Sequence, residues 1–189
     1  MSKIAAIYLF FLVAQAAYSI EVKNMSSSAE NLFSEVVAGD NNPNKCTPKI
    51  TENFVGIKIN TPDTVQWAFG DKDKFTGAFA KMMVCGIYRL AAKDLFDTDG
   101  FNLTASLIAT DSRTHKSFTA KMAADSLMLE DPNPRKPAPE ELEGVFETGY
   151  FNINALALLP LPEKDAEYTI FVMFKHFKSN VAVVKLQQK

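Results

Sequence analysis

The sequence predicts an all-β fold, a sandwich of about seven to nine short strands. Apolar side chains alternate with polar ones at a period of two through much of the chain after residue 48. Turn-forming residues interrupt this pattern about every ten residues, and no long stretch has helical spacing. An up-and-down barrel is the main alternative, but it requires more even strand spacing than the proline-rich segment at 130–143 allows.

The composition is that of a single globular domain. Of the 189 residues, 47% are hydrophobic and 22% are charged, which excludes the disordered and fibrous classes. The 20 Lys and Arg residues nearly balance the 22 Asp and Glu residues, for a net charge of -2. This balance gives no electrostatic reason to expect a nucleic acid as partner.

The first 19 residues resemble a secretory signal peptide. Lys3 supplies the positive start, and Ile4–Val13 form an apolar run. Either Ala14-Gln15-Ala16 or Ala17-Tyr18-Ser19 suits a cleavage site, and we favour cleavage after Ser19. An uncleaved anchor needs about 20 apolar residues, and this run is shorter. We therefore predict a secreted or periplasmic protein with no membrane span after cleavage.

Residues 20–47 read as a flexible, poorly ordered leader before a β-domain at 48–189. The leader is rich in Ser, Asn, Asp and Glu, and only 29–37 has a short helical pattern. Two glycosylation sequons begin at Asn24 and Asn102, and both are acceptors only in a eukaryotic secretory pathway.

The two cysteines predict one disulfide. Export exposes Cys46 and Cys85 to an oxidising compartment, and a lone pair has one possible internal connectivity. The closed loop would stabilise the fold by about 3.5 to 4 kcal/mol in the chain-entropy model. A redox or metal-binding pair is the alternative, but the spacing is unlike C-x-x-C and only His115 and His176 could assist.

Eight segments carry a strand pattern. In the first, Val55, Ile57 and Ile59 share one face, and in the second Val65 and Trp67 do so, which predicts a buried tryptophan. The predicted strands cover residues 54–60, 64–70, 79–90, 101–110, 117–122, 145–154, 167–177 and 181–186.

The connections follow from turn residues and prolines. Residues 61–63 (Thr-Pro-Asp) and 111–115 read as turns, and the proline-rich 130–143 as a surface loop. Residues 155–161 suit one helical turn. The final two strands form a hairpin whose turn we expect at 178–180.

The penultimate strand is apolar on both faces, with Phe171, Met173 and Phe177 on one of them. Its approach, Asp165-Ala166-Glu167-Tyr168-Thr169-Ile170, resembles the tyrosine corner of immunoglobulin-like domains. The resemblance implies an immunoglobulin-like sandwich in which the hydroxyl of Tyr168 turns back onto upstream backbone. The sequence departs from the antibody pattern, because Ile170 stands where the second cysteine would be.

No catalytic constellation is evident. His115 and His176 are the only histidines, and no G-x-S-x-G elbow accompanies them. The carboxylates at 140–143 crowd into the proline-rich loop, where charge normally serves solvation. A secreted hydrolase with an unrecognised site is the second hypothesis.

A third hypothesis is a calcium-dependent adhesion module. Asp97 and Asp99 precede a glycine, as acidic ligands do in calcium loops. The regular calcium-loop register is missing, and Asp is also a common turn residue, so we favour a turn. We predict no cofactor.

The first hypothesis is a secreted, non-catalytic module that binds an unknown protein or carbohydrate through its loops or a free sheet edge. The proline-rich loop, with Pro134 and Pro137, is the first candidate. Tyr88 and Tyr150 are candidates for an aromatic platform.

Overall fold

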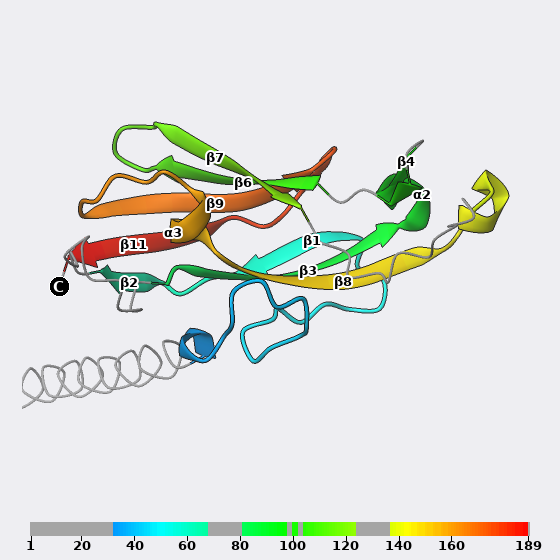
Figure 1. Ribbon diagram of the computed structural model, residues 1–189, viewed down its shortest axis with the longest axis horizontal. Coiled ribbons are helices and arrows are strands. Elements are labelled where there is room, and N and C mark those ends of the chain that lie inside the picture. The colour runs from blue at the N-terminus through cyan, green and yellow to red at the C-terminus, as the bar shows by residue number, and fades with distance from the viewer. Residues whose placement is uncertain (1–31, 68–80, 98–99, 102–103, 124–136, 189) are drawn as a thin grey trace, which may run out of the picture.

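The computed structural model describes residues 32–67, 81–97, 100–101, 104–123 and 137–188. Two β-sheets pack face to face, as Figure 1 shows, so the predicted all-β sandwich is confirmed at this level. The signal-peptide segment and the asparagines of both sequons lie outside the described residues. Among the residues described, no helix has the length and apolar character that a membrane crossing requires.

The smaller sheet has three antiparallel strands in the order β1-β3-β8. These are β1 (Gly56–Asn60), β3 (Met83–Ala91) and β8 (Phe146–Asn154). Side chains at alternate positions of β3 face opposite sides: Val84 joins the main core, whereas Met83 and Cys85 face away from the larger sheet.

The larger sheet has the order β2-β11-β9-β6-β7. Its strands are β2 (Thr64–Trp67), β6 (Thr104–Asp111), β7 (Ser117–Ala123), β9 (Ala166–Phe174) and β11 (Ala182–Gln188), and the short β10 (Phe177–Lys178) pairs with the end of β9. All pairs are antiparallel except β2 with β11, which is parallel. The predicted turn at 61–63 is therefore the place where the chain passes from one sheet to the other.

Short elements connect the strands. α2 (Ala92–Leu95) follows β3 and leads into a small hairpin of β4 (Phe96–Asp97) and β5 (Gly100–Phe101). The 3-10 helix η1 (Pro139–Leu142) precedes β8, and α3 (Ala155–Leu158) follows it, as the expected helical turn.

The main core lies between the sheets and is built from one face of each strand. Leu107 of β6, Ile170 and Val172 of β9, and Val184 of β11 are fully buried there. Burial of side chains of this size supplies about 1.5–3 kcal/mol each, which makes this layer the principal source of stability.

The final hairpin forms as predicted, but its turn lies elsewhere. The chain reverses at Lys175 and His176, where Lys175 has a φ of 51°, and Phe177 pairs with Phe174. The prediction of a strand through residue 177 was wrong. The earlier turn brings Phe177 against the core instead of leaving its ring on the outer face.

The segment 32–47 departs from the flexible leader that its composition predicts. It lies against the side of the smaller sheet that faces away from the larger sheet (Figure 1), where Phe33, Val36 and Cys46 are buried with Met83 and Cys85. The predicted disulfide between Cys46 and Cys85 is present. Buried apolar side chains therefore fix the segment in addition to the covalent bond.

Candidate binding face

The outer face of the larger sheet carries apolar side chains where polar ones are expected. An antiparallel sheet with one buried face normally carries polar residues on the other. Here Ile108 of β6, Phe171 and Met173 of β9, and Val183 of β11 all alternate with core residues and face outward. We call these four residues the apolar stripe.

The strand register brings the stripe together across three strands. Ile108 pairs with Phe171, and Val183 pairs with Thr169, the residue two positions before Phe171 on the same face. Met173 is 38% exposed and Val183 48%, while Ile108 and Phe171 are half-buried. The stripe is therefore a partly solvent-accessible group of apolar side chains on the outer face, over the centre of the sheet.

Lysines flank the stripe on both sides. On one side, Met173 pairs with Ser106 of β6, and Ser106 pairs in turn with Lys121 of β7. On the other side, Met173 pairs with Lys178 of β10. The Nζ of Lys178 lies 4.2 Å from the centre of the Phe171 ring. This cation–π contact exists because the chain turns early, which places Lys178 beside the end of β9.

The charge of this face is opposite in sign to that of the chain. The outward-facing positions of β6, β7, β9, β10 and β11 carry Lys121, Lys178 and Lys185 against the single acid Glu167, so three positive charges minus one negative charge leave +2. Glu167 and Lys185 lie 4.0 Å apart and offset one another. The full chain has a net charge of -2. The face therefore favours a partner surface that is acidic at its rim.

The two tyrosines considered as a platform lie on opposite sides of the smaller sheet. Tyr88 faces the larger sheet and packs against the main core, with its ring over Gly149. Burial raises the pKa of Tyr88, and the negative charge of Glu147 raises it further. Tyr150 is half-buried on the other side, opposite Ile87. The structure does not bring the two rings together.

The remaining loop candidates are only partly described. Pro137 is half-buried just before η1, and Pro134 lies outside the described residues. Asp97 belongs to β4, where it pairs with Gly100 in a hairpin, as the turn interpretation expects. Asp99 also lies outside the described residues. In the described part of the chain, no three His, Cys, Asp or Glu side chains converge as metal ligands.

The two histidines stand at opposite ends of the larger sheet. His115 is in the turn after Asp111, whose strand partner is the start of β9, and His176 follows the end of β9. His176 is exposed, and its ring lies 4.0 Å from the ring of Phe177 between centres. A site that needs both histidines is not formed.

Tyr168 is buried, but its hydroxyl has no hydrogen-bond partner among the described residues. Its ring packs edge-on against Phe118. Burial raises its pKa, as does the charge of Asp111, its strand partner. The predicted hydrogen bond from this hydroxyl to upstream backbone is therefore not formed among the described residues.

A small open pocket lies beside β2. Its volume is about 290 Å³, at the lower end of the range typical of ligand sites, and its lining includes Phe33, Val65 and Lys81. No sequence pattern predicts this pocket, because Phe33 reaches β2 only through the docked segment 32–47.

No protein-family model, curated protein or solved structure matches this chain. A proposal about function must therefore be argued from the outer face of the larger sheet described above.

Proposed function

We propose that this protein is an exported, non-catalytic β-sandwich module that binds another protein through the outer face of its larger sheet. The observation that carries the proposal is the apolar stripe, which lies over the centre of an open sheet. Contiguous exposed apolar surface is costly in water and is typical of interaction sites.

A protein partner is favoured over a carbohydrate. Sugar-binding platforms present flat aromatic faces to water, whereas the only aromatic ring of the stripe, Phe171, has the ammonium of Lys178 at 4.2 Å from its centre. The stripe offers branched and thioether side chains instead, which suit an apolar protein surface. The lysines at its margins add selectivity for an acidic rim.

Export is part of the proposal. The first 19 residues have the pattern of a signal peptide, and the Cys46–Cys85 disulfide is compatible with an extracellular or periplasmic protein. The two alternatives from the sequence, a hydrolase and a calcium-dependent adhesion module, gain no support from the described residues.

The finer architecture that we propose is immunoglobulin-like. Strand order supports it, since β1, β3 and β8 correspond to the A, B and E strands of such sandwiches. β6, β9 and β11 then correspond to the C, F and G strands, and β7 to an added C′ strand. Tyr168 near the start of β9 has the place of the tyrosine corner on strand F. Such scaffolds host many functions, so this architecture alone identifies no partner.

The test uses two matched valines. Val183 on the proposed face is 48% exposed and Val55, outside it, is 45% exposed. The unmodified chain and the variants Val183→Asp and Val55→Asp are each immobilised and exposed to the extracellular fluid of the native source, after thermal unfolding has shown that all three are folded. We expect a captured protein to be lost with Val183→Asp and kept with Val55→Asp. Equal capture by all three, or equal loss by both variants, contradicts the proposal.

A further inference from the structure

Each sheet of the sandwich has two edge strands, and three of these four edges are protected from pairing. The amide of Asn180 covers the edge of β1: the N–H of Ile59 donates to its Oδ1 at 2.8 Å, and its Nδ2 donates to the carbonyl of Ile59 at 3.1 Å. The described part of β2 has four residues, and β7 carries the exposed Lys121. Short strands and lysines are the usual means of preventing edge-to-edge association.

The fourth edge, that of β8, is covered at one end only by the residues that the structure describes. The N–H of Gly39 donates to the carbonyl of Asn152 at 2.7 Å, so the docked segment 32–47 covers this position. Asn152 therefore directs its backbone groups away from β3. Because backbone groups alternate in direction along a strand, Phe146, Thr148 and Tyr150 also direct their N–H and C=O groups outward.

The opposite edge of the same sheet supports this assignment. Ile59 bonds to Asn180 and so points away from β3, which leaves Lys58 and Asn60 to pair with Ile87 and Cys85. The β3 residues between these, such as Tyr88, then form their hydrogen bonds with odd-numbered residues of β8, such as Gly149. Among the described residues, nothing bonds to the outward backbone groups of this five-residue edge, 146–150, which lies next to the covered position at Asn152.

We propose that this edge pairs with the same edge of a second copy of the chain, antiparallel and centred on Thr148. Such a pairing is two-fold symmetric and joins the two smaller sheets through about six main-chain hydrogen bonds. The inference is independent of partner binding by the apolar stripe, which lies on the other sheet.

The sequence of the edge is self-complementary in this register. Phe146 of one copy lies opposite Tyr150 of the other, Thr148 lies opposite Thr148, and Glu147 lies opposite Gly149. Aromatic pairs and threonine pairs are favourable across strands, and the two glutamates avoid each other. A register centred on Glu147 would set like charges face to face. The paired residues end at Tyr150, two positions before Asn152, whose carbonyl accepts from the N–H of Gly39.

The first experiment measures the mass of the purified chain by light scattering from about 1 to 500 µM, since short edge interfaces are weak. We expect a twofold rise in mass with concentration. Thr148→Pro removes an outward N–H and leaves the ladder to β3 intact, so this variant should remain monomeric. Thr119→Pro is the matched control, because Thr119 also directs its backbone outward from an edge strand. It should dimerise like the unmodified chain.

A charge exchange tests the register. Thr148→Glu and Thr148→Lys each place like charges at the two-fold axis and should each be monomeric, whereas an equimolar mixture should form a dimer. The same pair of substitutions at Thr119 should leave the homodimer unchanged. A mass that stays monomeric at all concentrations, or a dimer that survives Thr148→Pro, overturns the proposal.

Discussion

The side-chain amide of Asn180 forms a reciprocal pair of hydrogen bonds with the backbone of Ile59. Asn180 follows β10 in the larger sheet, and Ile59 lies in the edge strand of the smaller sheet. One amide thus takes the place of a neighbouring strand and joins the two layers at their margin.

Replacing Asn180 by Ala should lower the free energy of unfolding by about 1–3 kcal/mol, because both backbone groups of Ile59 lose their partner. Urea unfolding measures this change. Asn180→Asp keeps an acceptor but no amide donor, and it should fall between Asn180→Ala and the native chain. Gln187→Ala, on the exposed face of β11, is the control and should have no measurable effect.

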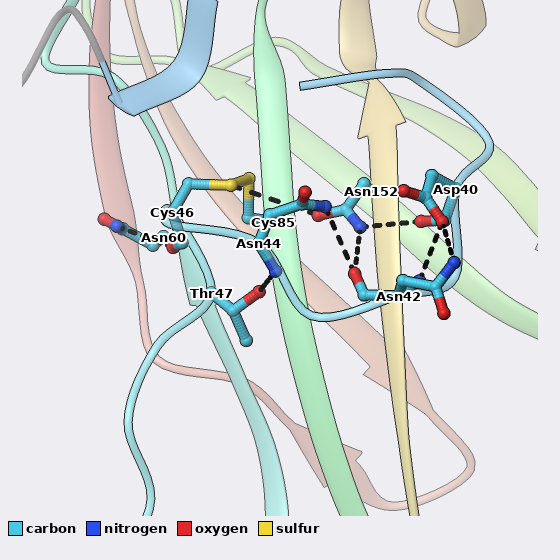
Figure 2. The surroundings of a disulfide bond; sticks show 8 residues. All are labelled: Asp40, Asn42, Asn44, Cys46, Thr47, Asn60, Cys85 and Asn152. Carbon is cyan, nitrogen blue, oxygen red and sulfur yellow. Dashed lines mark hydrogen bonds between the residues drawn. A yellow bond between two sulfur atoms is a disulfide. The ribbon is translucent and has the colours of Figure 1, made fainter. Parts of the chain in front are cut away.

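Asn152 holds the docked segment 32–47 on the smaller sheet. Its Nδ2 donates to the carbonyls of Asp40 at 2.6 Å and Asn42 at 2.9 Å, beside the disulfide (Figure 2). Asn60, in the same row of the sheet, donates to the carbonyl of Cys46 at 3.0 Å. The side chains of Asn60 and Asn152 therefore both bind the backbone of the docked segment.

Asn152→Ala should loosen this segment without unfolding the sandwich. We expect faster amide hydrogen exchange at 39–42, because the two carbonyls lose their donor and the local turn opens. Mass spectrometry of peptides that cover 39–42 and β9 measures it, with β9 as the internal control. Unchanged exchange at 39–42 would show that the apolar contacts of Phe33 and the disulfide suffice.

Gly86 of β3 is required by the ring of Phe151, its partner on β8. A Cβ at position 86 would lie 2.0 Å from the ring, which is closer than any van der Waals contact. Gly86→Ala should therefore destabilise the fold by about 1–3 kcal/mol. The double variant Gly86→Ala with Phe151→Ala should cost less than the sum of the two single variants, since the clash is gone. Additive losses would contradict this explanation.

Asp111 should make the free energy of unfolding fall at acid pH. Hydrogen bonds from the N–H of Thr114, from Lys164 and from the N–H of Arg113 lower the pKa of Asp111 to about 2, although burial opposes them. An Asp pKa in an unfolded chain is about 3.9. The folded carboxyl thus holds its proton less tightly, and its stabilising contribution is complete above about pH 4 and is lost as the pH falls towards 2.

The matching experiment compares urea midpoints at several pH values between about 5 and 2. The native chain should lose stability over this range more steeply than Asp111→Asn, which has no carboxyl to titrate. Lys164→Ala should be intermediate, because the two backbone N–H donors remain. Parallel curves for the native chain and Asp111→Asn would show that Asp111 is not the source of the acid dependence.

Much of the fold could be predicted because alternation and turn chemistry are local. The strand at 117–122 and those at 145–154 and 181–186 were placed within about two residues, which is the usual uncertainty of such boundaries. The disulfide followed from having two cysteines and one possible pairing. Only part of the proposed binding face could be predicted: Phe171 and Met173 stood out as a second apolar face, but no sequence pattern linked them to Ile108 or Val183.

The sequence by itself determined which side chains of each strand share a face, where most strands begin and end, and which cysteines bond. The tertiary structure decided that β1 and β2 join different sheets, that 32–47 docks through Asn152, and that Ile108 lies beside Phe171. The physical reason is that periodicity follows from the geometry of one backbone segment. The choice of neighbour depends on contacts between residues distant in sequence, and these form only when the whole core packs.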